Sequence, residues 1–129
     1  MRAPCSYDYA IIRVVPRVER EEFINAGVIV SCPALEYLAA RIELDESRLR
    51  AIAPDIDLDT VRENLGSIPA ICAGTGPIGR LTPRERFHWL VAPRSTMIQT
   101  SSVHTGRSDD PSRLLEQLLQ KMVRSAGPR

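Results

Sequence analysis

The residue types best suited to chemistry gather between positions 84 and 104, where arginines, a tryptophan, hydroxyls and a histidine follow one another closely. Arginine offers a planar fork of N–H donors that fits phosphate and carboxylate groups, and this fork followed by hydroxyls is typical of anion sites. A histidine beside them can act as a donor or as an acid or base near neutral pH. The segment therefore predicts an anion pocket, and its candidate residues are Arg86, Trp89, Arg94, Ser95, Thr96 and His104.

A structural explanation competes with this pocket. A helix whose tryptophan closes the core, followed by a polar edge strand, would show the same residue types in the same order. The whole chain has two histidines, and no carboxylate is evident opposite His104. This shortage of acid–base partners favours the structural explanation.

The remaining motifs give little sign of catalysis. Residues 74–79 match the letters of the dinucleotide fingerprint, but Pro77 interrupts the loop, and residues 93–99, about 20 positions further on, contain no carboxylate. We interpret this stretch as a helix-to-helix loop. The three cysteines are far apart within apolar runs, and neither histidine lies at metal-ligand spacing. We therefore expect no catalytic set, no metal and no cofactor.

Composition indicates one globular domain over residues 1–129, with a core at about 7–123 and short flexible termini. A formal net charge of +1 disfavours nucleic-acid binding, because such surfaces normally carry excess positive charge. No apolar run is long enough to span a membrane, and no signal-peptide core opens the chain. With cysteines that suit a reducing compartment, we expect a cytoplasmic location and no membrane contact.

The first half of the chain predicts the sheet. Residues 7–15 form a strand that is apolar on both faces, so it belongs in the middle of a covered sheet. Arg13 is its exception and should pair with a carboxylate, for which Glu19, Glu21 and Glu22 are the candidates. A charged connection follows, then a bulge or tight turn at Asn25–Gly27, a strand at 28–32 and a half-buried strand within 35–44.

The second half predicts the helices. Start signals at Asp45, at Asp57 or Asp59, at Thr82 and at Asp110 open four of them, and Pro69 should kink or split the second. Residues 95–105 suit an edge strand or an ordered surface segment. The last helix carries a wide apolar stripe, for the core or for a partner, and Gly127 closes it. This order predicts an α+β domain, an antiparallel sheet of three to four strands with helices packed on it.

Two runs, RVVPRVEREEFINAGVIV and RFHWLVAPRSTMIQTSSVHTGRSDDP, resemble the small bacterial proteins grouped as domain of unknown function 3037. The resemblance spans nearly the whole chain, residues 7–123. It implies a functional partner, because members are often encoded beside a HipA-like kinase, and it carries over no catalytic residue. The runs map onto Arg13, Glu22, Phe23, Asn25, Gly27, Arg86, Trp89, Arg94, Ser95, Thr96 and His104.

Two hypotheses follow. The first is a small cytoplasmic accessory protein, a binding module rather than an enzyme, that acts with a HipA-like kinase and can also self-associate. The alternative is a small enzyme or sensor that binds a phosphorylated ligand or nucleotide at Arg86, Arg94 and His104. An exposed apolar patch would favour the first, and a concave pocket where the arginines converge would favour the second.

Overall fold

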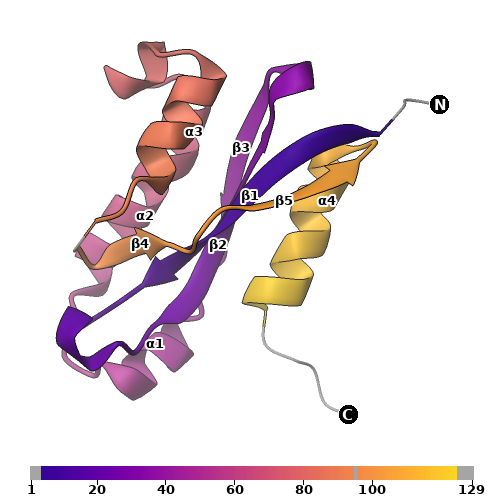
Figure 1. Cartoon of the computed structure of the whole chain (residues 1–129). Helices are drawn as coiled ribbons and strands as arrows, with labels where there is room; N and C mark the ends of the chain where they lie inside the picture. The colour runs from indigo at the N-terminus through magenta and orange to yellow at the C-terminus, as the bar shows by residue number, and fades with distance from the viewer. Residues whose placement is uncertain (1–3, 95, 125–129) are drawn as a thin grey trace.

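A computed structural model describes residues 4–94 and 96–124 as an open antiparallel sheet with helices on both faces (Figure 1). Four strands follow the order β3-β2-β1-β4, and β5 pairs with the other end of β1. The α+β prediction is therefore confirmed. The strands are β1 (Cys5–Val14), β2 (Ile24–Cys32), β3 (Tyr37–Ile42), β4 (Ile98–Thr100) and β5 (His104–Ser108).

Five strands form where three to four were predicted, because the segment expected as one edge strand divides into two. Strand β1 is ten residues long and offers its whole outer side for pairing. Strand β4 occupies the Ile12–Val14 end, and β5 pairs with Cys5–Tyr9. Between them Ser101 turns inward, and its hydroxyl accepts a hydrogen bond from the Ile11 N–H at 2.9 Å.

The helices cover both faces of the sheet, with α1, α2 and α3 on one side and α4 on the other (Figure 1). Their bounds are α1 (Glu46–Ile52), α2 (Leu58–Cys72), α3 (Pro83–Val91) and α4 (Pro111–Leu118), and α4 continues as a π-helical turn over Leu119–Val123. The apolar stripe of α4 is buried against Val28 and Val30 of β2, so it serves the core. The predicted closure at Gly127 lies outside the described residues.

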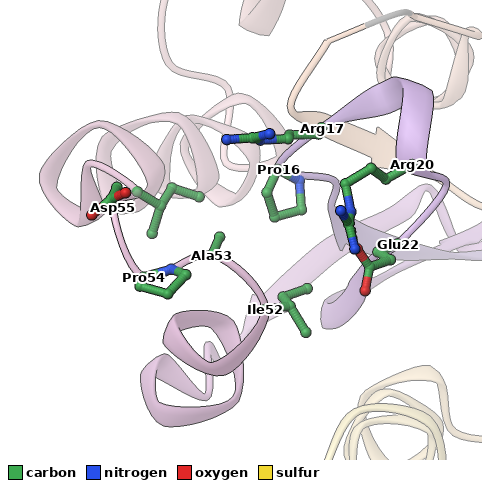
Figure 2. A pocket seen from close by; sticks show the side chains of 9 residues that line it. Pro16, Arg17, Arg20, Glu22, Ile52, Ala53, Pro54 and Asp55 are labelled. Carbon is green, nitrogen blue, oxygen red and sulfur yellow. Dashed lines mark hydrogen bonds and ion pairs between the residues drawn. The ribbon is translucent and has the colours of Figure 1, made fainter.

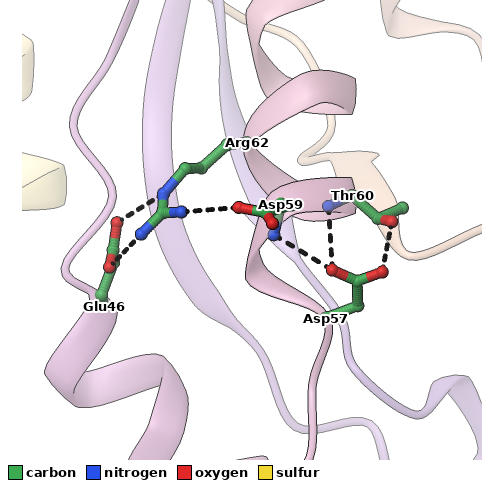
Figure 3. A network of polar contacts seen from close by, with 5 residues as sticks. All are labelled: Glu46, Asp57, Asp59, Thr60 and Arg62. Atoms are coloured by element: carbon green, nitrogen blue, oxygen red, sulfur yellow. Dashed lines mark hydrogen bonds and ion pairs between the residues drawn. The ribbon is translucent and has the colours of Figure 1, made fainter.

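The predicted helix starts are confirmed by their hydrogen bonds. The Asp45 and Asp110 side chains accept from backbone N–H groups in the first turn of α1 and α4, and Thr82 forms a full capping box with Glu85. Asp57, rather than Asp59, caps α2 (Figure 3). Helix α2 is not split at Pro69 but continues to Cys72, because the missing N–H removes a single helical hydrogen bond, the one to the Leu65 carbonyl.

Alternation along β1 and β2 explains why the sheet needs cover on both faces. Ile12 and Val14 are fully buried under α1, α2 and α3, while Tyr7 and Tyr9 pack on the opposite face, in the α4 cluster. Strand β3 is predicted to be half-buried, and Arg41 is exposed as expected. Ala39, whose side chain shares that face, nevertheless packs in the α4 cluster.

The irregularity predicted at Asn25–Gly27 is a β-bulge within β2, not a turn before it. The register shifts between Ile12 and Arg13, which leaves Ala26 as the extra residue. Gly27 is required here because an added Cβ would lie 2.5 Å from the Arg41 carbonyl oxygen. The strand therefore begins earlier than predicted, at Ile24.

Candidate functional site: the hairpin surface and the α3 groove

The predicted anion-pocket residues separate into three unrelated environments. The first is the end of α3, where the Arg94 guanidinium stacks on the Trp89 ring at 4.4 Å. The same guanidinium donates to the carbonyl oxygens of Leu90 at 3.1 Å and Trp89 at 2.5 Å. These are carbonyls of the last helical turn, so Arg94 compensates the negative end of the helix dipole.

Trp89 and Arg94 line a groove of about 290 Å³ between α2, α3 and β4, which we call the α3 groove. Its walls are mainly apolar, with Ile68 and Ile71 from α2 facing Met97. Thr96 also lines it, and its hydroxyl is engaged by the Ile98 carbonyl at 2.8 Å. Ser95 lies outside the described residues. The groove joins three of the predicted residues, but its single guanidinium is already occupied by the helix end.

The Arg86 guanidinium forms hydrogen bonds at the junction between α2 and α3, and these bonds occupy the donors that were expected to bind a ligand. Its Nη1 donates to the carbonyls of Ile71 at 3.1 Å and Cys72 at 2.7 Å, and its Nε donates to Leu81 at 3.0 Å. These bonds close the end of α2 against the start of α3. His104 lies on β5 and stacks on Tyr9 at 5.2 Å, on the α4 face of the sheet.

Arg86, Arg94 and His104 therefore do not converge in one pocket. The prediction relied on nearness in sequence, whereas α3 and the crossing to β5 carry these side chains to different sides of the sheet. Each guanidinium binds carbonyls at a helix end, because that is where the chain offers unpaired acceptors.

A different surface forms at the opposite end of the molecule from the α2–α3 loop, where the β1–β2 connection meets the loop between α1 and α2 (Figures 1 and 2). A groove of about 370 Å³ lies between them. Its lining residues are Pro16, Arg17, Arg20, Glu22, Ile52, Ala53, Pro54, Asp55 and Ile56. Prolines and isoleucines line it together with charged side chains of both signs.

Three large apolar side chains stand exposed at this end, Val18 and Phe23 at 44% and Ile52 at 37%. We call these three residues, together with the groove, the hairpin surface. Val18 and Phe23 belong to the same connection that lines the groove, and Ile52 lines it directly. Exposed apolar side chains on a segment that borders a concavity are typical of a protein-binding site.

The other predicted residues, Arg13, Glu22 and Asn25, lie in or next to the β1–β2 connection that forms the hairpin surface. Arg13 stacks over the Phe23 ring at 4.2 Å, and the Asn25 amide donates to the Met122 carbonyl at 2.9 Å. Glu22 lies in the groove and pairs with Arg20. The structure thus places Arg13, Glu22 and Asn25 at one end of the molecule.

The prediction that Arg13 pairs with a carboxylate is wrong. No ion pair within the described residues joins Arg13 to Glu19, Glu21 or Glu22, and the Arg13 Nε is buried without a hydrogen-bond partner. The β1–β2 connection folds into a short 3₁₀ turn that leaves Glu19 and Glu21 exposed, Glu22 pairs with Arg20, and Phe23 supplies an aromatic face to Arg13. A cation–π contact therefore stands where a salt bridge was expected.

Sequence reasoning missed Ile52 and Pro54, which line the groove of the hairpin surface from the end of α1 and the loop that follows it. The only available signal was an apolar residue at the end of a short helix followed by proline. That pattern is shared by many buried helix ends, so it could not identify a surface.

The described residues give no support to thiol or metal chemistry. Burial raises the pKa of the Cys72 thiol to about 11, although the nearby Arg86 guanidinium opposes the shift. A thiol with this pKa is almost wholly protonated near neutral pH and is a poor nucleophile. Across residues 4–94 and 96–124, no group of three or more His, Cys, Asp or Glu side chains could hold a metal ion.

Comparison with known proteins identifies the family. The model of the family described as Protein of unknown function (DUF3037) matches residues 9–123. The chain belongs to this family. No curated protein and no solved structure gives a significant match. The match confirms the resemblance seen in the two sequence runs. In addition, no helix among the described residues of this DUF3037 protein is long and apolar enough to cross a membrane.

Proposed function

We propose that this protein is a small cytoplasmic accessory protein of bacteria that works by binding a protein partner at its hairpin surface. The observation that carries the proposal is the exposure of Val18 and Phe23 on the β1–β2 connection, together with exposed Ile52 in the groove that this connection borders. Large apolar side chains that meet water beside a concavity gain free energy when a partner covers them.

The hairpin surface also has the composition of a transient interface. Apolar residues and the charged Arg17, Arg20, Glu22 and Asp55 line the same groove, and mixed charges at an interface set partner orientation more than affinity. Phe23 is held in place by its contact with Arg13, so little side-chain freedom is lost when a partner covers the ring.

Family membership suggests the first partner to test. The resemblance to proteins encoded beside HipA-like kinases implies that such a kinase acts together with this chain. A non-catalytic subunit that binds a kinase needs a docking surface and no active site of its own. The hairpin surface meets that need.

The test starts with the tagged chain recovered from its native host, followed by identification of bound proteins and of small molecules in the same eluate. Affinity for the purified HipA-like kinase is then measured for a double variant, Phe23→Ser with Ile52→Asp. We expect binding at least about tenfold weaker than wild type, since hot-spot residues dominate interface energy.

The matched control is Leu81→Ser with Val103→Asp, which changes two exposed apolar residues that do not belong to the hairpin surface. This control should bind like wild type, and both variants should unfold within a few degrees of it. Equal weakening by both variants would contradict the proposal. An eluate with a retained phosphorylated compound and no protein partner would also contradict it.

A further inference from the structure

The two edges of the sheet differ in a way that the proposed function does not use. Strand β3 forms one edge and is six residues long. Its side chains contribute to both cores, yet five of its six residues are only half-buried, whereas its neighbour β2 is buried almost throughout. The exposed part of β3 is therefore its outer edge.

The hydrogen bonds of the sheet show which groups of β3 point outward. The Glu43 N–H donates to the Ala26 carbonyl of β2 at 2.8 Å, in register with the β2–β3 pairing. Because direction alternates along a strand, Leu38, Ala40 and Ile42 direct their N–H and C=O groups away from β2. Within the described residues, no backbone or side-chain group forms a hydrogen bond to them.

By contrast, the opposite edge of the sheet, formed by β4 and β5, is protected against pairing with another strand. Strand β4 has three residues, and the outward carbonyl of Ile98 is already bonded to the Thr96 hydroxyl. Strand β5 has the polar sequence HTGRS, with a glycine and an arginine. Short length, local hydrogen bonds and charge are the usual means by which proteins prevent edge pairing. Strand β3 has neither the short length nor, within the described residues, the local hydrogen bonds that protect β4. Its one charged residue, Arg41, is paired with Glu116.

We propose that a second copy of this chain pairs with β3, so that two β3 strands join antiparallel across a two-fold axis into one continuous sheet. This proposal is independent of the hairpin surface. In such a pair, the outward N–H and C=O groups of the two β3 strands face each other in only two kinds of register. The two-fold axis passes either through an outward residue or midway between two outward residues. Centring on Ala40 pairs Leu38 with Ile42 of the second copy and uses every outward group of the strand, with about six hydrogen bonds between chains.

The side chains in this register are compatible with close approach. Two alanines meet at the axis, apolar Leu38 faces apolar Ile42, and Arg41 lies opposite Ala39 instead of a second Arg41. Shifting the centre one residue toward the end of the strand would set Arg41 against Arg41, which like-charge repulsion disfavours.

Charges beside the edge are self-complementary as well. On the α4 side, Arg41 pairs with Glu116, and Arg124 joins Glu116 to Glu43 at 2.8 Å each. This network contains two guanidinium and two carboxylate groups and has no net charge. A surface with both signs can face its own two-fold copy, whereas a surface of one sign would repel it.

Amide hydrogen exchange on the wild-type chain, measured alongside sedimentation over a wide range of concentrations, tests the proposal without any substitution. We expect a concentration-dependent dimer in which the amides of Leu38, Ala40 and Ile42 become protected as the dimer forms. The outward amides of Thr105 and Arg107 on β5 serve as controls and should exchange rapidly at every concentration.

The second test is Ala40→Pro, which removes an outward N–H while leaving the β2 ladder intact. We expect the dimer dissociation constant to rise about 30-fold or more, because two symmetric hydrogen bonds are lost. The matched variant, Thr105→Pro, removes an outward N–H from the other edge and should dimerise like wild type. A monomer at all concentrations with rapidly exchanging β3 amides would overturn the proposal, and so would a dimer protected at β4 or β5.

Discussion

Arg86 is expected to hold the α2–α3 junction together, and Arg86→Ala measures that role. The substitution removes three donor contacts, to Leu81, Ile71 and Cys72. The Ile71 carbonyl keeps a second donor, the Gly74 N–H at 3.0 Å, but the Cys72 carbonyl has no other recorded partner among the described residues. The main cost is therefore one partly buried carbonyl left without a donor.

The magnitude follows from these contacts. An unsatisfied carbonyl costs roughly 1–3 kcal/mol, and loss of a cation at a helix end adds several tenths, so we expect about 2 kcal/mol in the free energy of unfolding. For a domain of this size that loss lowers the unfolding midpoint by roughly 8 °C. Arg86→Lys keeps the charge but cannot reach all three carbonyls, so it should recover only part of the loss.

Urea unfolding followed by circular dichroism and by Trp89 fluorescence provides the measurement. Arg107→Ala is the control, because Arg107 is exposed and makes one hydrogen bond of 3.3 Å to the Pro4 carbonyl. A loss below about 0.5 kcal/mol for Arg86→Ala, the range of ordinary surface substitutions, would refute the structural role. Binding of a partner at the hairpin surface should be unaffected, since that surface lies at the other end of the molecule (Figure 1).

Three further outcomes are expected. Arg84→Met should destabilise the domain by about 1–2 kcal/mol in urea unfolding, because Asp8 and the buried Ser31 hydroxyl lose their donor; a loss no larger than that of Arg107→Ala would contradict this. The Cys72 thiol, with a pKa of about 11, should react with a thiol reagent at pH 8 only after unfolding, and rapid labelling of the folded chain would contradict its burial. The hydrogen bond from the backbone N–H of Thr82 lowers the pKa of Glu85 below its ordinary 4.5, so its stabilisation is present above that pH and lost as pH falls below it; Glu85→Gln should flatten the acid side of a midpoint-versus-pH curve.

The sequence alone determined the helices, the central strands and the family of this protein. Helix starts at Asp45, at Asp57 or Asp59, at Thr82 and at Asp110 were predictable because a cap needs only a side chain and backbone groups two or three residues away. The central position of β1 followed from its apolar character on both faces, and the irregularity near Gly27 followed from residues that tolerate unusual backbone geometry.

Only the tertiary structure decided how the candidate residues are used. An arginine side chain is long, and which acceptors lie within its reach depends on how the helices pack. Arg86 and Arg94 therefore bind carbonyls that could not be predicted from the local sequence. Arg13 found the Phe23 ring for the same reason. The hairpin surface joins residues near position 20 to residues near position 54, and the outer edge of β3 is open because no second strand among residues 4–94 and 96–124 pairs with it. Such surfaces arise from contacts between distant segments, and the spacing of residues along the chain does not encode them.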